Sequence, residues 1–511
     1  MKLNYKRTLC VGFAFFLIMV FWQAYDTIIP KILTDKFGMS QTASGFVMAL
    51  DNLLGLFLLP LFGAISDRCS ARLGKRTPFI LVGTVVAAVL FVCLSFVDGA
   101  QLAKLADAGV IDSERGLATI YEAQKDAELM TPEGDRFVLS ELYTEEEFTA
   151  IRSAMDGEEN PAYTNYVVPA RQAYAWSVTK GAPGTLVVFM VILLLVLVAM
   201  AIFRSPAVAL MPDVTIKPLR SKANAVINLM GSAGGILVLI LGLVFATSST
   251  QNAMMRYTVF FSVIAFIMLA ALCIFMLTVR EPKFALDMQR ESKRYGIDEG
   301  EDDGSGSRAL SKPERKSLIF ILLSVMLWYM GYNAVTSKYS VYAGQVLGLD
   351  YNLTLMIAQA AAIVAYLPVG VISSKIGRKK AILAGVVMLA LAFGCASLMR
   401  RGSSVLVMDA LFALAGVAWA TINVNSFPMV VETSRGSDIG RYTGFYYTAS
   451  MAAQTATPMI SGFFMDHLGM TTLFPYAAAF VLLALVTMLM VHHGDNKPIA
   501  KKGLEAFNVE D

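Results

Sequence analysis

The chain has 511 residues, of which 56% are hydrophobic and only 16% are charged, whereas soluble domains carry roughly 25% charged residues. This composition excludes an ordinary soluble protein, and a net charge of +3 is too small to indicate nucleic-acid binding. The five cysteines are scattered without metal-ligand spacing, so we expect reduced thiols and no metal site.

Apolar segments follow one another along the chain, each long enough for the roughly 20 residues that cross a bilayer core. Twelve such spans are expected, at 8–33, 42–66, 77–97, 184–209, 223–247, 257–279, 316–344, 352–374, 380–399, 404–430, 440–465 and 472–492. The first is too long for the apolar part of a signal peptide. The pattern predicts an all-α membrane protein with twelve transmembrane helices in two pseudo-symmetric six-helix bundles, at 1–279 and 316–492.

The short loops after the second, fourth, eighth and tenth spans are rich in lysine and arginine. Because basic loops stay on the cytoplasmic side, both termini are expected in the cytoplasm, in a multi-pass protein of the cytoplasmic membrane. The glycine-rich, polar segment 280–315 cannot bury a core and is expected to be a flexible cytoplasmic linker. Residues 493–511 are expected to form a cytoplasmic tail.

A long polar insertion, 98–183, separates the third and fourth spans on the outer side. It carries sixteen acidic and seven basic residues. Residues 141–155 fit an amphipathic helix capped by Thr144. We expect a small helical cap over the outer mouth; a ligand-gathering or partner-binding domain is the alternative.

Two carboxylates fall within neighbouring spans, Asp26 in the first and Asp51 in the second, at similar depth. Buried charges cost several kcal/mol in a bilayer, and two close carboxylates favour binding a proton or a cation. We therefore expect both to couple to an ion, H⁺ or Na⁺; the alternative is a hydrogen bond between helices. Arg204 in the fourth span either faces the cavity beside a carboxylate or extends its charge to the cytoplasmic surface.

A polar, aromatic cavity is predicted in the second half. Its candidate residues are Trp328, Tyr332, Asn333 and Lys338 in the seventh span, Asn423 and Asn425 in the tenth, and Tyr446 in the eleventh. Aromatic faces with amide donors suit sugar rings, although each residue alone could serve helix packing. The sequence shows no phosphate-binding loop and no nucleophile–base constellation, so we expect neither an enzyme nor an organic cofactor, and an ion or substrate gradient as the energy source.

A charged loop after the second span has a shorter copy after the eighth. The residues concerned are Gly63, Asp67, Arg68, Arg72, Gly74 and Arg76, with Gly370, Lys375, Gly377 and Arg378 in the copy. The pattern resembles the gating loop of the major facilitator superfamily. The resemblance implies that Asp67, Arg68, Arg72 and Arg76 latch the cytoplasmic ends together when the cavity opens outward.

Four extra residues, 69–72, expand the first loop, and in this form it resembles the branch of sucrose transporters and glycoside–pentoside–hexuronide cation symporters. We therefore expect a monomeric secondary transporter in the lipid bilayer that moves a sugar or glycoside by cation symport with alternating access. The alternatives are an exporter of amphipathic small molecules and a membrane receptor that does not transport.

Overall fold

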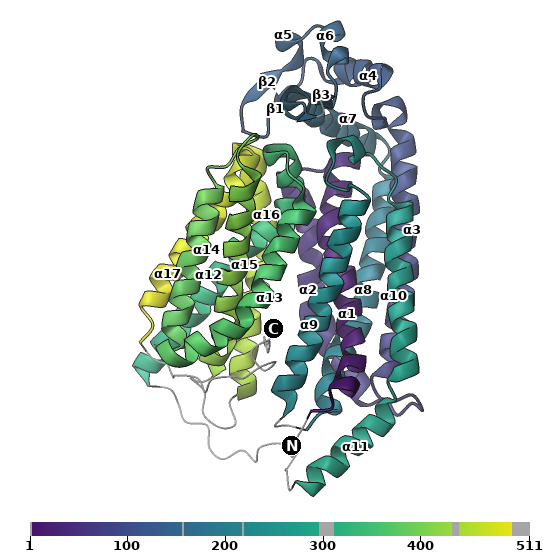
Figure 1. Ribbon diagram of the computed structural model, residues 1–511. Helices are drawn as coiled ribbons and strands as arrows, with labels where there is room; N and C mark the ends of the chain where they lie inside the picture. Colours follow the sequence, from purple (N-terminus) through teal and green to yellow (C-terminus); the bar gives the residue numbers. More distant parts are fainter. Residues whose placement is uncertain (1–2, 156–157, 217–218, 296–310, 432–438, 493–511) are drawn as a thin grey trace.

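The computed structural model describes residues 3–155, 158–216, 219–295, 311–431 and 439–492. Within them, twelve long helices stand in two groups side by side (Figure 1). The first group is α1 (Tyr5–Lys31), α2 (Gln41–Asp67), α3 (Thr77–Lys104), α8 (Gly184–Asp213), α9 (Arg220–Val244) and α10 (Thr258–Thr278). The second is α12 (Lys312–Tyr342), α13 (Tyr351–Ile376), α14 (Arg378–Ala396), α15 (Val405–Val431), α16 (Ile439–Leu468) and α17 (Leu473–Leu489). The predicted all-α fold with paired bundles is confirmed.

Ten of the described helices are long and apolar enough to cross a bilayer. In α13 the apolar stretch found among the described residues is shorter, Tyr351–Tyr366. The two halves also share local features: α1 and α12 both continue into a five-residue π-helical turn, Ile32–Lys36 and Ala343–Leu347. These shared ends agree with the internal repeat expected from the loops.

Each half has a hydrophobic core of its own. In the first half, Phe91 packs on Phe21 and Phe261, with ring centroids 5.1 and 4.3 Å away. In the second half, Tyr339 packs on Phe412 with ring centroids 4.3 Å apart. Since each core is close-packed, each half can move as a rigid body.

The insertion folds into short elements that lie above the first half in Figure 1. They are α4 (Glu114–Gln124), β1 (Glu128–Met130), β2 (Arg136–Val138), α5 (Leu139–Leu142), α6 (Glu145–Ala150), β3 (Ala154–Met155), β4 (Glu158–Glu159) and α7 (Val168–Gly181). β1 pairs antiparallel with β2, with Leu129 opposite Phe137, and β3 pairs antiparallel with β4. Below, the end of the bundles that carries the insertion is called the insertion end.

The predicted cap at Thr144 is confirmed. Thr144 and Glu147 form a capping box, in which each side chain accepts from the other residue's backbone N–H. These hydrogen bonds from Thr144 lower the pKa of Glu147. The helix is shorter than expected and ends at Ala150.

Helix α3 continues past the predicted end of its span because its polar last turns have buried partners. The Asp98 carboxylate forms a fully buried ion pair with Lys36, with both oxygens 2.7 Å from Nζ. The Gln101 amide donates to Thr179 of α7 at 2.9 Å. The insertion is therefore anchored to α3 by the buried contact between Gln101 and Thr179.

The first part of the segment predicted to be a flexible linker is instead a helix, α11 (Glu281–Arg294). The prediction was wrong there because Glu281 is a buried acceptor rather than a solvated charge. Its carboxylate accepts from the backbone N–H groups of Lys75, Arg76 and Thr77 at 2.7–2.9 Å. This end of the bundles is called the α11 end; residues 296–310 and the predicted tail 493–511 lie outside the described residues.

Candidate functional site

Three charged side chains meet inside the first half. Asp26 of α1 interacts electrostatically with Asp51 of α2 and with Arg204 of α8, and Asp51 interacts with Arg204. All three are half-buried. The Arg204 guanidinium lies over the Trp22 ring, 5.4 Å from its centroid, which favours the cavity-facing interpretation of Arg204. The structure brings together the residues that the sequence suggested for ion coupling.

A cavity of about 450 Å³ lies between α2 and α16, and its link to this charged cluster is Asn52, the neighbour of Asp51. Asn52 lines it and donates from its amide to the Asp51 carboxylate at 2.8 Å. The rest of the lining is mostly apolar: Leu53, Leu56, Thr448, Met451, Ala452, Thr455, Ala456, Met459 and Ile460. The cavity lies between the two halves, where relative movement would change its shape.

An aromatic pair forms the second half's part of the site. Tyr332 of α12 stacks flat on Trp419 of α15, with centroids 3.6 Å apart and an interplanar angle of 2°. Both rings are half-buried, so part of their surface is accessible. Sequence reasoning found Tyr332 and missed Trp419, although Trp419 precedes Asn423 by four residues, which places both on one side of a helix.

Three predicted amides of the second half have a buried polar atom without a protein partner in the described structure. Among the described residues, no hydrogen-bond partner is seen for Asn333 Nδ2, Asn423 Oδ1 or Asn425 Oδ1. The other end of the Asn425 amide donates to the Thr421 carbonyl at 2.9 Å. Buried polar groups normally have a partner, so these atoms are suited to a ligand or to water.

Three other predicted cavity residues are buried in this structure. Trp328 is fully buried in the apolar core of the second half. Tyr446 is also buried, and its hydroxyl pairs with those of Ser426 at 3.0 Å and Tyr329 at 3.4 Å. Lys338 is fully buried at the insertion end, where its ammonium donates to the Gln41 carbonyl of α2 at 2.6 Å. Its role in the structure is to join the halves.

Further contacts close the insertion end between the halves. The Asp466 carboxylate of α16 caps the start of α2, accepting from Gln41 N and Thr42 N at 2.7 Å each. Thr247 and Tyr351 share a hydrogen bond of 2.6 Å between their hydroxyls. Deeper in the molecule, the Gln359 amide of α13 donates to Gln23 of α1 at 2.6 Å.

The gating loop at the α11 end makes its ion pairs within the first half. Arg76 is buried and pairs with Asp67 and, at 2.8 Å, with Asp213 at the end of α8. It also donates to Ser66 and to the Gly63 carbonyl. Arg68 and Arg72 are exposed. The structure thus gathers Asp67 and Arg76, while Arg68 and Arg72 remain at the surface.

Two glycines shape these loops. Gly74 has φ +118°, and a Cβ there would lie 2.3 Å from the Glu281 carboxylate, so glycine is needed for the close approach of α11. Gly377 has φ +95° and alone separates α13 from α14, which begins at Arg378. Gly370 is buried in α13, and Lys375 is exposed in its last turn. The second loop is therefore a tight corner.

Replacing Arg76 by Gln is expected to lower the free energy of unfolding by about 1–2 kcal/mol. The change removes a buried guanidinium that bridges Asp67 and Asp213, whose side chains are 61% and 36% exposed and so only partly desolvated. Thermal unfolding in detergent measures the effect. Arg72→Gln in the same loop, at an exposed position, is the control and should leave the unfolding temperature unchanged. Equal effects would contradict a bridging role.

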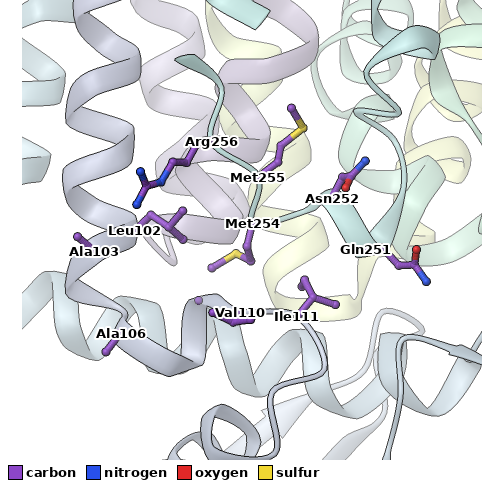
Figure 2. Close-up of a pocket in the computed structure, with 11 residues that line it drawn as sticks. Leu102, Ala103, Ala106, Val110, Ile111, Gln251, Asn252, Met254, Met255 and Arg256 are labelled. Carbon is purple, nitrogen blue, oxygen red and sulfur yellow. The ribbon is translucent and has the colours of Figure 1, made fainter. Parts of the chain in front are cut away.

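A second cavity, about 520 Å³, lies at the insertion end (Figure 2). Figure 2 shows Met254 among Leu102, Val110 and Ile111, with Arg256 nearby. Residues at the end of α3 and in the loop before α10 line this cavity. None of the predicted site residues lines it, so it is separate from the charged cluster.

Known protein families match most of the chain. The family described as Major Facilitator Superfamily matches residues 172–366 and 351–508, and that described as MFS/sugar transport protein matches residues 10–106. Two curated relatives match over 59 residues, 12% of this chain. Sucrose transport protein SUC3 of Arabidopsis thaliana is 34% identical there, over 10% of its length. Proton-associated sugar transporter A of Homo sapiens is 44% identical, over 7% of its length.

Solved structures of transporters share the fold over nearly the whole chain. The inward-open xylose transporter XylE from E. coli has a TM-score of 0.51 and 16% identity, covering 98% of both chains. A bacterial homologue of the iron transporter ferroportin has a TM-score of 0.59 and 13% identity, covering 96% of this chain and 98% of its own. With the family match and the paired six-helix halves, these likenesses lead to one conclusion: the chain belongs to the major facilitator superfamily of secondary transporters.

Proposed function

We propose that the protein carries a sugar or glycoside across the cytoplasmic membrane by symport with a proton or another cation. The observation that supports it most is the meeting of Asp26, Asp51 and Arg204 inside the first half. Asn52, which donates to Asp51, connects this cluster to a cavity between the two halves. Carboxylates near the middle of a membrane are costly unless they bind an ion or a partner. Here one arginine lies near two carboxylates, which leaves one negative charge for a proton or a cation.

The second half supports a sugar as the substrate class. The half-buried Tyr332–Trp419 pair offers an aromatic face. Asn333 Nδ2 offers a donor, and Asn423 Oδ1 and Asn425 Oδ1 offer acceptors, without a protein partner for these atoms in the described part of the chain. Sugar rings combine apolar C–H faces with a rim of hydroxyl groups. The named sugar transporters that match part of the chain favour the same class.

In our proposal the insertion end faces outside and the α11 end faces the cytoplasm, an orientation that the positive-inside rule supports. In this orientation the contacts of Asp466, Lys338 and Tyr351 close the outer side, which supports an inward-facing state. In the proposed cycle, Asp26 and Asp51 bind the cation from outside, the substrate binds between the halves, and the outer contacts close as the cytoplasmic side opens.

Counterflow of radiolabelled sucrose, maltose and xylose into proteoliposomes tests the proposal. We expect uptake of at least one sugar, with net accumulation that follows an imposed pH or sodium gradient. The proposal would be contradicted if no sugar showed counterflow and no sugar accumulated under an imposed gradient.

The second candidate is export of amphipathic small molecules, which the mostly apolar lining of the cavity between α2 and α16 favours. Gradient-driven transport of a lipophilic cation such as tetraphenylphosphonium, without sugar counterflow, would support that function instead. A receptor that does not transport would fail both assays.

A further inference from the structure

The insertion, which belongs to the first half, holds the second half through one arginine. Arg401, in the loop between α14 and α15, pairs with Glu159 of β4 at 3.2 Å. It also donates to Thr164 Oγ1 of the insertion at 2.9 Å and to the Gly344 carbonyl of the second half at 3.1 Å. Arg401 is thus fixed to its own half and to the insertion at the same time.

Glu159 is tied to the first half as well. Its other carboxylate oxygen accepts from the backbone N–H of Thr250 at 3.1 Å and from the Thr250 hydroxyl at 2.5 Å. Thr250 lies in the loop between α9 and α10 of the first half. One carboxylate therefore connects the insertion, the first half and the second half.

A second contact between the insertion and the second half is made by backbone alone. The turn of the β1–β2 hairpin reaches the top of the second half in Figure 1. A Cβ on Gly134 in this turn would lie 2.6 Å from the Leu468 carbonyl oxygen, and one on Gly469 would lie 2.6 Å from Gly134 N. Two glycines with positive φ, +103° and +95°, permit this approach between α16 and the hairpin.

The insertion itself is held by the first half through α7. The Gln101 amide of α3 donates to Thr179 of α7 at 2.9 Å, and both side chains are buried. The Gln172 amide of α7 donates at 3.0 Å to Asp35, in the π-helical turn that follows α1. Because the Gln101–Thr179 contact is buried and the contacts of Arg401 are partly exposed, separation of the halves breaks the contacts to the second half first.

We propose that the insertion is an external latch, in which Glu159 and the β1–β2 turn grip Arg401 and the end of α16 to hold the insertion end closed. In an alternating-access transporter this end has to open once in each cycle. A partly exposed ion pair suits such a latch because it is weak enough to release. The latch follows from the family's two-body motion and does not depend on which substrate is carried.

Spin-label distances across the insertion end test the latch without any substrate. The labels are placed on cysteines introduced at Lys180 of the first half and Ser404 of the second, both exposed, in a variant lacking the five native cysteines. In lipid nanodiscs, Glu159→Gln and Arg401→Gln are each expected to raise the population of long, open distances about threefold, as expected for loss of a partly exposed ion pair. The exchanged pair, Glu159→Arg with Arg401→Glu, should restore the closed distances.

Arg115→Gln is the matched control. It removes the exposed Arg115–Asp107 pair, 2.8 Å long and wholly within the insertion but outside the β1–β2 hairpin, and should leave the distances unchanged. If Arg401→Gln yields too little folded protein, Thr164→Val removes one bond to Arg401 and should shift the distances in the same direction. The latch would be overturned if the spin-label distances in the Glu159 and Arg401 variants equalled those of the control. A loss of sugar counterflow with these shifts intact would reject only the proposed substrate.

Discussion

Asp51→Asn is expected to abolish gradient-driven accumulation of substrate while leaving exchange across the membrane intact. The amide keeps the size of the side chain and a partner for Asn52, but it cannot bind a proton or a cation in place of the carboxylate. With one proton per substrate, a gradient of one pH unit supports up to about tenfold accumulation. The variant should reduce this ratio to one.

Proteoliposomes with imposed pH or sodium gradients provide the measurement, and counterflow in the same vesicles shows that the variant still carries substrate. Asp409→Asn is the control, because Asp409 lies near the start of α15 and outside the cluster of Asp26, Asp51 and Arg204. Unchanged accumulation by Asp51→Asn would remove Asp51 from the coupling mechanism.

Gly45→Ala is expected to hinder closure at the insertion end and to slow exchange at least about fivefold, as expected for a steric cost of about 1–3 kcal/mol in the closed state. Helices α2 and α16 touch here backbone to backbone. A Cβ on Gly45 would lie 2.0 Å from the Pro458 carbonyl oxygen and 2.4 Å from its carbon. No rotamer change relieves a clash with backbone, so the halves would have to stay apart.

Gly55→Ala in the same helix is the matched control. A Cβ at Gly55 would meet only the flexible Leu59 side chain, at 3.6 Å, and should be tolerated. Exchange rates and the spin-label distances described above measure both variants. If Gly45→Ala matched Gly55→Ala in rate and in distance, the close approach of α2 and α16 would not limit the cycle.

The number and order of the membrane helices could be predicted because a bilayer imposes a minimum apolar length that is visible in one sequence. The gathering of Asp26, Asp51 and Arg204 was also predictable, since each is a charge in an apolar span. The positions of Trp328 and Lys338 were not. Because polar side chains such as Asn333, Ser337 and Lys338 are spread around α12 rather than along one face, its sequence does not reveal which face turns toward a cavity and which toward its neighbours.

Helix α11 and Trp419, which stacks on Tyr332, show a different limit of prediction from sequence. Segment 280–315 is polar in composition, and its first part is fixed by tertiary contacts such as that of Glu281 with three backbone N–H groups. Trp419 lies in an apolar segment, where a tryptophan by itself does not indicate a binding site. Its stacking on Tyr332 depends on how α12 and α15 pack together.

The separate cores of the two halves bear on how the molecule unfolds. Phe91 and its neighbours belong to one packed unit, while Tyr339 and its neighbours belong to another. Two such units need not lose structure together, so heating should produce more than one cooperative transition rather than a single melting temperature. Destabilisation at Arg76 would then appear in the transition of the first half, with the second half retaining its own.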